Sequence, residues 1–424
     1  MSLFNSFKFD KTGKIYLFIL ICISFTIPLS VTLNSIAVGL LVIYWVATGG
    51  VGQKLILVIK NKFFWLYASF YLIQLVGILY STDVADALSK LEKKAALLLF
   101  PFLILSLPAL KPKQLFYVIL AFACSIFGLT AFAVFKIWQM QGSLFNVPNL
   151  TETIDDIIHL HHAYSGLYIV FSICSLVYIV NHSWNLLNMF YRAFTIILIL
   201  GLYVMLVILG ARMAIFISFV VLGLQILIFT IQKRRFYTLA FISFTVLIGF
   251  IGILNLPSTR AKLNEILFYR GVYHPFTPRL IQWQCCVEVV HENQAWLQGV
   301  GTGDVKPLLQ SCYQAKKFWG ERYHYNSHNE YLEELMRHGL IGLFLLLLAL
   351  IFPLFISIRQ RHYLYFYFLF IFMIACLSEA ILNRQKGVVF YAFFNALLFM
   401  SLLSRKNKFQ NLDIEEGKNA IVAK

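Results

Sequence analysis

The sequence is poor in charged residues, and its charges are divided unequally by sign. Of its 424 residues, 13% are charged and 60% are hydrophobic. Soluble domains have roughly 25% charged and 45–50% apolar residues, so an ordinary soluble protein is excluded. Acidic residues are the scarcest, with 19 Asp and Glu against 35 Lys and Arg, and the net charge is +16. We do not expect nucleic acid as a partner, because the cations collect in links between apolar runs, as on the inner face of a membrane protein.

Several motifs that would indicate other chemistry are also absent. The cysteines lack the CxxC spacing of metal sites, and no G-x-S-x-G nucleophile elbow is present. The first apolar run has no small-residue cleavage motif, so we expect a retained helix rather than a removed signal peptide. The chain also lacks the internal repeat that many transporters have.

The seven cysteines fall into two groups. Four lie in apolar runs and are expected in the core: Cys22, Cys124, Cys174 and Cys376. Three lie in a long polar loop: Cys285, Cys286 and Cys312. A disulfide is expected in this loop if it faces an oxidising space. The sequence leaves open whether Cys312 would pair with Cys285 or with Cys286.

Apolar runs of about 18 residues recur along the chain and predict about twelve membrane-spanning helices. The predicted class is therefore an all-α, polytopic integral membrane protein. The expected spans lie near residues 16–29, 35–46, 63–79, 95–107, 115–138, 164–180, 193–209, 213–231, 236–254, 340–358, 363–382 and 387–403. This gives nine spans in residues 1–254, a large helical loop at 255–338, three spans in 339–404, and a tail at 405–424 that its composition predicts to be disordered.

Because successive spans cross the membrane in opposite directions, the basic links and both chain ends are expected on one face of the membrane. By the positive-inside rule that face is cytoplasmic, so the 255–338 loop is expected to face outward, into a periplasm-like space. A second polar loop, which contains Asp155, His159, His161 and His162, is expected on the same outer face. We interpret its histidines as a polar rim rather than a metal site, because no third ligand stands at a suitable spacing.

The central stretch is the polar segment 323–342, which runs directly into an apolar span. Ser327 followed by Glu330 fits a capping box, which predicts a helix beginning at Ser327 with His328 in its first turn. The helix dipole disfavours a second positive charge there, so we expect a neutral imidazole that can accept a proton from a hydroxyl. The alternative, that His328 simply packs at a polar interface, is equally consistent with this segment alone.

Cations on the outer face suggest a bound anion. Arg212 lies in a turn of almost no length between two apolar spans, and the alternative to anion binding is that its side chain extends toward lipid headgroups. Lys90, Lys93 and Lys94 precede the fourth span, where nearby acidic residues can also balance them.

The large outer loop adds further candidates. Arg279 and Trp283 are four residues apart on one face of an expected helix, and Arg322 and His324 precede His328. Alternate glycines at 299–303 are interpreted as a flexible turn, because no strand–helix pattern surrounds them as in a nucleotide loop.

Arginines and one imidazole, without metal or nucleotide motifs, suit the transfer of a sugar from a lipid diphosphate. The leaving group needs charge neutralisation, which the forked guanidinium provides, and the acceptor hydroxyl needs a base.

Four segments then resemble one family. The segment from His328-Asn-Glu-Tyr to Gly339-Leu-Ile-Gly342 resembles the signature of the bacterial O-antigen ligase and polymerase superfamily. Gly210-Ala-Arg212 resembles its short turn with an essential Arg, although Ala211 stands where many relatives have Ser. Pro278-Arg279 with the following glycines resembles the start of its large periplasmic loop, and the stretch from Glu379 to Gly387 also fits.

The resemblance implies an enzyme of the bacterial inner membrane, with cytoplasmic termini and a periplasmic active site. It would be a glycosyltransferase that moves O-antigen from undecaprenyl diphosphate to a lipid A core sugar, without metal, ATP or another cofactor. By the motif match, His328 would be the base, and Arg212 and Arg279 would bind the diphosphate. We add five candidate substrate-binding residues: Arg322, His324, Asn329, Lys93 and Lys94.

The acceptor is left open by the sequence. An O-antigen polymerase, or an oligosaccharyltransferase acting on protein Ser or Thr, would use the same lipid-linked donor. A transporter or flippase is the alternative from another class, but it predicts ionisable groups deep inside spans and paired broken helices.

Overall fold

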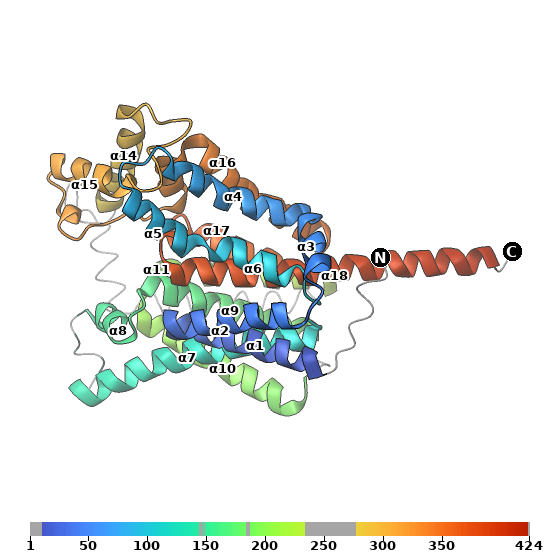
Figure 1. Ribbon diagram of the computed structural model, residues 1–424. Helices are drawn as coiled ribbons and strands as arrows, with labels where there is room; N and C mark the ends of the chain where they lie inside the picture. Colours follow the sequence, from blue (N-terminus) through green and yellow to red (C-terminus); the bar gives the residue numbers. More distant parts are fainter. Residues whose placement is uncertain are drawn as a thin grey trace.

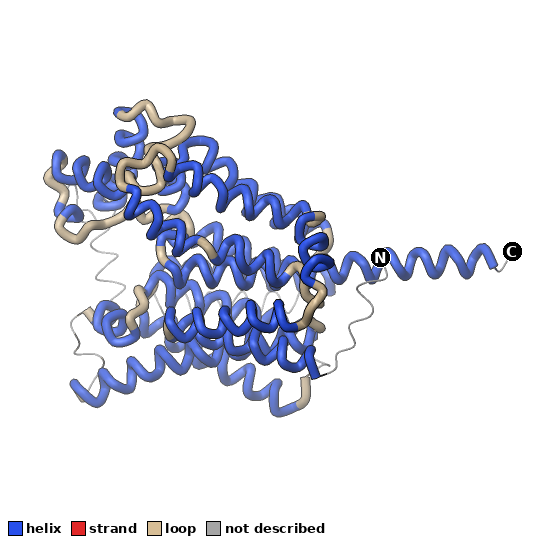
Figure 2. The backbone as a smooth tube through the Cα atoms, viewed as in Figure 1, coloured by secondary structure: helices blue, strands red, loops and turns tan. Residues whose placement is uncertain are grey.

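The computed structural model describes residues 11–422 apart from 143, 145–146, 148, 184–186 and 234–276. Within this described part, all regular secondary structure is helical (Figure 2). The predicted all-α class is confirmed.

Seven described helices are long and apolar enough to cross a membrane, and counting a bent pair of helices as one span gives up to eight. This is the pattern of a multi-span membrane protein. The seven are α1 (Lys11–Leu29), α7 (Pro112–Gln141), α9 (His162–Ser183), α10 (Met189–Leu209), α11 (Arg212–Lys233), α16 (Glu330–Arg359) and α18 (Gln385–Val422). The bent pair is α2 (Val31–Ala47) and α3 (Val51–Ile59), which meet at 111°.

The remaining expected spans do not reach that length. The apolar helices α4 (Lys62–Ile78) and α17 (Tyr363–Ala375) are shorter, and α6 (Ala96–Ile104) has only 9 residues. The span expected at 236–254, and the start of the expected 255–338 loop, lie outside the described residues. The total of about twelve spans therefore stays a prediction.

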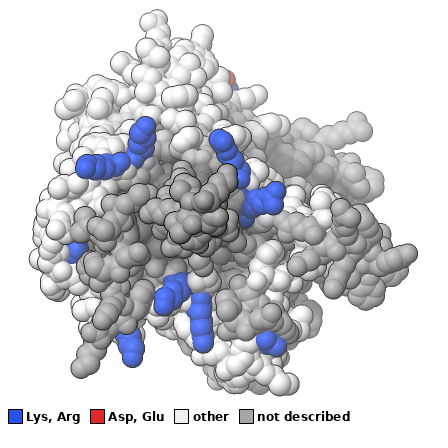
Figure 3. Space-filling view, turned by 90° about the vertical axis from the view of Figure 1, so that its right-hand side faces the viewer, with Lys and Arg blue, Asp and Glu red and all other residues white. Residues whose placement is uncertain are grey.

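The bundle is built around one continuous apolar core. Helix α9 lies centrally, against α7, α10, α11 and α17, while α16 packs on α4 and α17, and α18 packs on α6 and α17. Lys and Arg side chains are spread around the end of the bundle from which the C-terminal part of α18 extends, and Asp and Glu are almost absent from that face (Figure 3). Helix α18 continues to Val422, so the prediction of a disordered tail was wrong.

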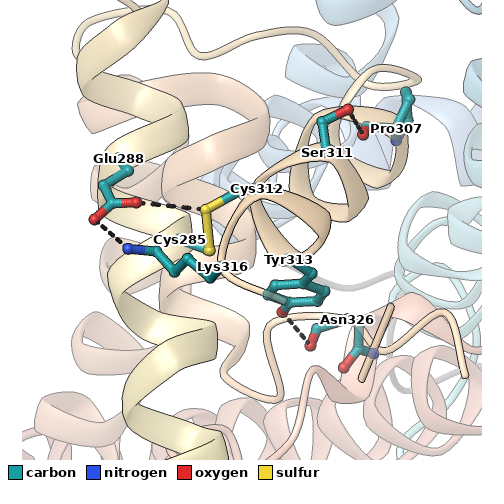
Figure 4. Close-up of a disulfide and its surroundings, with 8 residues drawn as sticks. All are labelled: Cys285, Glu288, Pro307, Ser311, Cys312, Tyr313, Lys316 and Asn326. Atoms are coloured by element: carbon teal, nitrogen blue, oxygen red, sulfur yellow. Dashed lines mark hydrogen bonds and ion pairs between the residues drawn. A yellow bond between two sulfur atoms is a disulfide. The ribbon is translucent and has the colours of Figure 1, made fainter. Parts of the chain in front are cut away.

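A separate lobe lies at the opposite end of the bundle (Figure 1). It contains α14 (Thr277–Glu292), α15 (Val305–Ala315), the 3-10 helix η4 (Trp319–Glu321) and the start of α16, and it has its own apolar cluster. Cys285 on α14 and Cys312 on α15 form a disulfide with a Cα–Cα distance of 5.7 Å (Figure 4). This settles the pairing that the sequence left open, and Cys286 is a buried free thiol.

Helix α16 is broken at His338 and Gly339, and the glycine-rich loop fits against the break. Gly339 has φ 62°, and a Cβ added to Gly299 would lie 2.3 Å from the Arg337 carbonyl carbon and oxygen, so neither position tolerates a side chain. The amides of Val300 and Gly301 donate to the carbonyls of Met336 and Arg337, at 2.8 and 3.1 Å. The alternate glycines therefore belong to a tightly packed brace, and their interpretation as a flexible turn was wrong.

Candidate functional site

His328 lies in the loop that precedes α16, close to its first turn. The helix begins at Glu330, and Asn329 is its N-cap, because its side-chain oxygen accepts hydrogen bonds from the amides of Tyr331 and Leu332. The predicted capping box from Ser327 was therefore wrong. The Ser327 hydroxyl instead donates to Glu333 Oε2 at 2.7 Å, and His328 has a left-handed φ of 46°.

The imidazole of His328 faces a carboxylate from a distant part of the chain. Its Nδ1 lies 2.8 Å from Oε2 of Glu379, which follows α17 and precedes the 3-10 helix η5 (Ile381–Asn383). The two side chains are 15% and 7% exposed. A carboxylate at Nδ1 fixes the tautomer and stabilises the imidazolium that forms when Nε2 takes a proton. Among the described residues, Nε2 has no hydrogen-bond partner, so it is available to a hydroxyl. The charge environment of His328 is thus set by Glu379, which the helix-dipole argument did not include.

Arg279 lies beside this pair, on the first turn of α14. Burial lowers the pKa of its guanidinium, and the neighbouring Glu379 carboxylate raises that pKa. Its Nη1 is buried and has no hydrogen-bond partner in the described part of the chain. The structure therefore pairs His328 with Glu379, places Arg279 within electrostatic reach of that carboxylate, and leaves one guanidinium nitrogen without a hydrogen-bond partner among the described residues.

The junction of α8 (Leu150–Ile158) and α9 borders the same place. Burial and the neighbouring His162 lower the pKa of His161, while Glu379 and Asp155 raise it. His162 Nδ1 lies 2.8 Å from Asp155 Oδ2. Asp155, His161 and His162 offer three potential ligand atoms within 4.8 Å of one another, and they are the residues of this region that a divalent metal would use. The pairing of His162 with Asp155 also satisfies these groups as an outward polar rim.

Arg212 begins α11, directly after a turn in which Gly210 has a left-handed φ of 62°. The near-absence of a loop between these two spans is as predicted. The side chain is exposed, and the end of α10 contacts α8 through a hydrogen bond from Thr151 to the Leu209 carbonyl. Among the described residues, no hydrogen bond or ion pair joins Arg212 to His328, Glu379 or Arg279. It lies near the α8 edge of the site, and a role with Arg279 stays a prediction.

The five additional candidates differ in exposure. Arg322 and His324 are exposed on the loop between η4 and His328, and Lys93 is partly exposed at the end of α5 (Val84–Lys94). Asn329 is buried and occupied in capping α16, and its side chain also donates to the Leu377 carbonyl. Lys94 is 1% exposed and paired with Glu334 at 3.2 Å. In this structure Asn329 and Lys94 hold the loop and the helix rather than face a substrate.

A buried network lies beneath the His328 loop. Gln74 donates to Glu334 and accepts from Lys94, at 2.9 and 3.0 Å, and His338 Nδ1 contacts the same Glu334 carboxylate. Arg337 is paired with Glu333 at 3.0 Å, and its Nη1 lies 3.8 Å from Oε2 of Glu334. All four charged members are nearly inaccessible to solvent: Lys94, Glu333, Glu334 and Arg337.

Sequence reasoning gave no role to Glu379, Glu333 or Arg337. The signal for the last two was present, because acidic and basic residues three to four apart in Glu333-Glu-Leu-Met-Arg337 share a helix face. The signal for Glu379 was a lone acid inside an otherwise apolar stretch, which indicates a functional or paired group. Its partner, His328, could not be read from spacing.

A family model matches part of the chain. No curated protein matches the chain. Residues 193–347 match the family whose model is described as O-antigen ligase, and this range contains Arg212, Arg279 and His328. This match supports the O-antigen ligase superfamily for residues 193–347, which are less than half of the chain.

Proposed function

We propose that this protein is an O-antigen ligase that transfers a glycan from undecaprenyl diphosphate to a sugar hydroxyl of the lipid A core. The observation that carries the proposal is the contact of His328 Nδ1 with Glu379 at 2.8 Å, with Arg279 near the same carboxylate. This arrangement supplies a base, a group that orients it, and a cation for an anionic leaving group.

In the proposed reaction, the acceptor hydroxyl gives its proton to His328 Nε2 as its oxygen attacks the anomeric carbon of the donor. The bond from that carbon to the diphosphate oxygen breaks, and undecaprenyl diphosphate leaves with the electron pair. Glu379 stabilises the imidazolium during this step. The proton passes from His328 to water once the product has left.

Arg279 is proposed to bind the donor diphosphate. Its buried Nη1 without a partner provides a donor in a place of low water content, where a charge-assisted hydrogen bond is strongest. Arg212, Arg322, His324 and Lys93 are proposed as further contacts from the exposed rim. The proposed chemistry requires no metal or nucleotide, because the donor already has an activated leaving group.

Two features support an orientation with this site facing the periplasm. The opposite end of the bundle has the ring of Lys and Arg that the positive-inside rule assigns to the cytoplasm (Figure 3). The disulfide between Cys285 and Cys312 lies in the lobe that contains Arg279 and is expected only in an oxidising compartment (Figure 4).

An O-antigen polymerase and a protein O-oligosaccharyltransferase remain the alternatives, because all three reactions share the donor and the base. We favour the ligase because the His328-Asn329 segment and the single late lobe fit that resemblance best. A transporter is less consistent with the site, since the polar groups of the site gather at one end of the bundle rather than along its axis.

A deletion strain complemented with the wild-type gene separates these functions. Loss of a ligase leaves bare core, with polymer retained on the carrier lipid. Loss of a polymerase leaves core capped with one repeat, and loss of a protein glycosyltransferase leaves lipopolysaccharide unchanged. Transport of labelled lipid-linked glycan by the purified protein, without any covalent product, would contradict all three enzymes.

A further inference from the structure

The two members of the His328–Glu379 pair come from segments far apart in the chain, so some contact must hold the segments in register. His328 belongs to the loop before α16, whereas Glu379 lies between α17 and η5. Arg337 is 1% exposed and lies between these segments. One nitrogen, Nη2, donates to Glu333 Oε1 at 3.0 Å and to Asn383 Oδ1 at 2.9 Å.

The Glu333 side of this bridge leads to His328. Glu333 Oε2 accepts a hydrogen bond from the Ser327 hydroxyl at 2.7 Å, and the Ser327 amide lies 3.4 Å from the same oxygen. Ser327 is the chain neighbour of His328, whose backbone has a left-handed φ. A carboxylate that binds both polar groups of Ser327 fixes where this strained turn begins.

The Asn383 side leads to Glu379. Asn383 ends η5, the 3-10 turn that directly follows the Glu379 segment. Its backbone N–H donates to the Ala380 carbonyl at 3.2 Å. A second link runs in parallel, because Glu330 Oε2 accepts from the Leu382 amide at 2.7 Å. Arg337 is therefore the charged group that connects the carboxylate behind His328 with the turn that follows Glu379.

We propose that Arg337 is a positioning residue, which holds His328 and Glu379 in register for proton transfer without touching substrate. This inference rests on the proposed function. Nη2 bonds both acceptors, Nη1 lies 3.8 Å from Glu334, and neither Nη1 nor Nε has a hydrogen-bond partner among the described residues. A lysine would keep the charge, but its side chain is shorter and lacks the planar geometry that places Nη2 between Glu333 and Asn383.

The test is Arg337→Lys in the purified full-length protein, with donor and acceptor supplied in detergent. We expect kcat to fall about 10- to 100-fold with little change in the donor KM, because small displacements of a reacting pair cost about that much. The pH profile of kcat should also shift, since Glu379 would stabilise the imidazolium less. Arg359→Lys is the matched control, because that arginine is exposed near the other end of the same helix.

A second measurement does not depend on catalysis. In protein labelled with 15N-histidine, and assigned by comparison with His328→Gln, the His328 imidazole resonances should change in Arg337→Lys and stay unchanged in Arg359→Lys. Unchanged resonances together with wild-type kcat would overturn the positioning role. So would an activity loss that only matches the fraction of unfolded protein.

A second variant avoids leaving a buried carboxylate without its partner. Asn383→Ala removes one acceptor of Arg337, and we expect the same fall in kcat, partly restored by Asn383→Asp, which keeps an acceptor oxygen. Full activity in Asn383→Ala would contradict the bridge. If the wild-type protein transfers no glycan, the proposed function fails, and the imidazole resonances still decide whether Arg337 positions the pair.

Discussion

Two groups of charged side chains flank the first turns of α16, and they differ in their access to water and in whether their charges are paired with one another. In the buried network, Lys94, Glu333, Glu334 and Arg337 are between 0% and 4% exposed, and each is in an ion pair. In the outer group, His328 is 15% exposed and Nε2 has no partner among the described residues, while Arg279 has a buried nitrogen without one.

This difference separates the charged groups that stabilise the fold from those that can take part in a reaction. Burial removes both charges of an ion pair from water, and only their mutual attraction and hydrogen bonds offset this cost. Removal of one member therefore destabilises the fold strongly. A partly exposed imidazole, with Nδ1 held by a carboxylate and Nε2 without a partner, can exchange a proton with an incoming hydroxyl. Two kinds of group therefore adjoin the start of α16: a buried network that stabilises the fold, and an outer group that can react with or bind a substrate.

The largest expected effect is on the rate of glycan transfer, through the outer group. His328→Ala should lower the rate of glycan transfer by about 10²- to 10⁴-fold, because the acceptor hydroxyl loses its base. The variant should still fold, since His328 is not part of the buried network. Transfer kinetics on purified protein check this, with His291→Ala as the control, because that histidine is exposed on α14. Near-normal turnover in His328→Ala would remove the general-base role.

The next effect is on the buried network, and it concerns the stability of the fold rather than the rate of glycan transfer. Lys94→Met breaks a buried ion pair of Glu334, which keeps Arg337 at 3.8 Å, and should lower the free energy of unfolding by about 3 kcal/mol. Lys316→Met breaks the exposed pair with Glu288, where both side chains are 31% or more exposed, and should cost under about 1 kcal/mol. Denaturant unfolding in detergent measures both. Equal costs for the two variants would mean that burial does not distinguish the two kinds of pair.

A smaller effect is expected for the guanidinium groups. Arg279→Lys should lower transfer about 10-fold or more, because a point charge replaces a fork of donors. Arg212→Lys should also impair transfer, but less, since Arg212 is exposed and water competes for its contacts. Steady-state kinetics over a range of salt concentrations provide the measurement. Wild-type behaviour of both variants would show that the diphosphate is bound elsewhere.

The smallest effect is a pH dependence of stability at the edge of the buried network. Burial lowers the pKa of Lys90 to about 8, from 10.5 when exposed. Between these values the unfolded chain binds the proton more tightly, so the free energy of unfolding should gain a contribution that rises with pH from about 8 to 10.5. Lys90→Met should remove that contribution. Identical pH slopes for the two proteins in detergent would show that Lys90 is not desolvated.

Much of the fold followed from local pattern. The apolar runs predicted the helices, and Gly210 with Arg212 predicted the near-absence of a loop between α10 and α11. The start of α16 was misplaced because Ser327 and Asn329 are both good caps, and the choice depended on Glu333, which binds the Ser327 hydroxyl. The glycine-rich brace was missed because its partner, the break at His338 and Gly339, lies in another segment.

Some residues of the candidate site could also be found from the sequence, and others could not. His328 and Arg279 could be named from residue type and resemblance, since an imidazole and guanidinium groups in outward polar loops suit a diphosphate leaving group. Glu379 could not be assigned to His328, because their pairing depends on how α17 packs against α16. Lys94 and Asn329 were expected to bind substrate, and only their burial showed that they have structural partners.

The amino-acid sequence by itself determined the helical, membrane-suited architecture and the residue types of the outer edge, because periodicity and hydropathy are local properties. Tertiary structure alone decided which charges are buried in pairs and which lie partly exposed at the outer edge. The physical reason is that desolvation and hydrogen bonding depend on neighbours in space, and here those neighbours lie in helices that are distant along the chain.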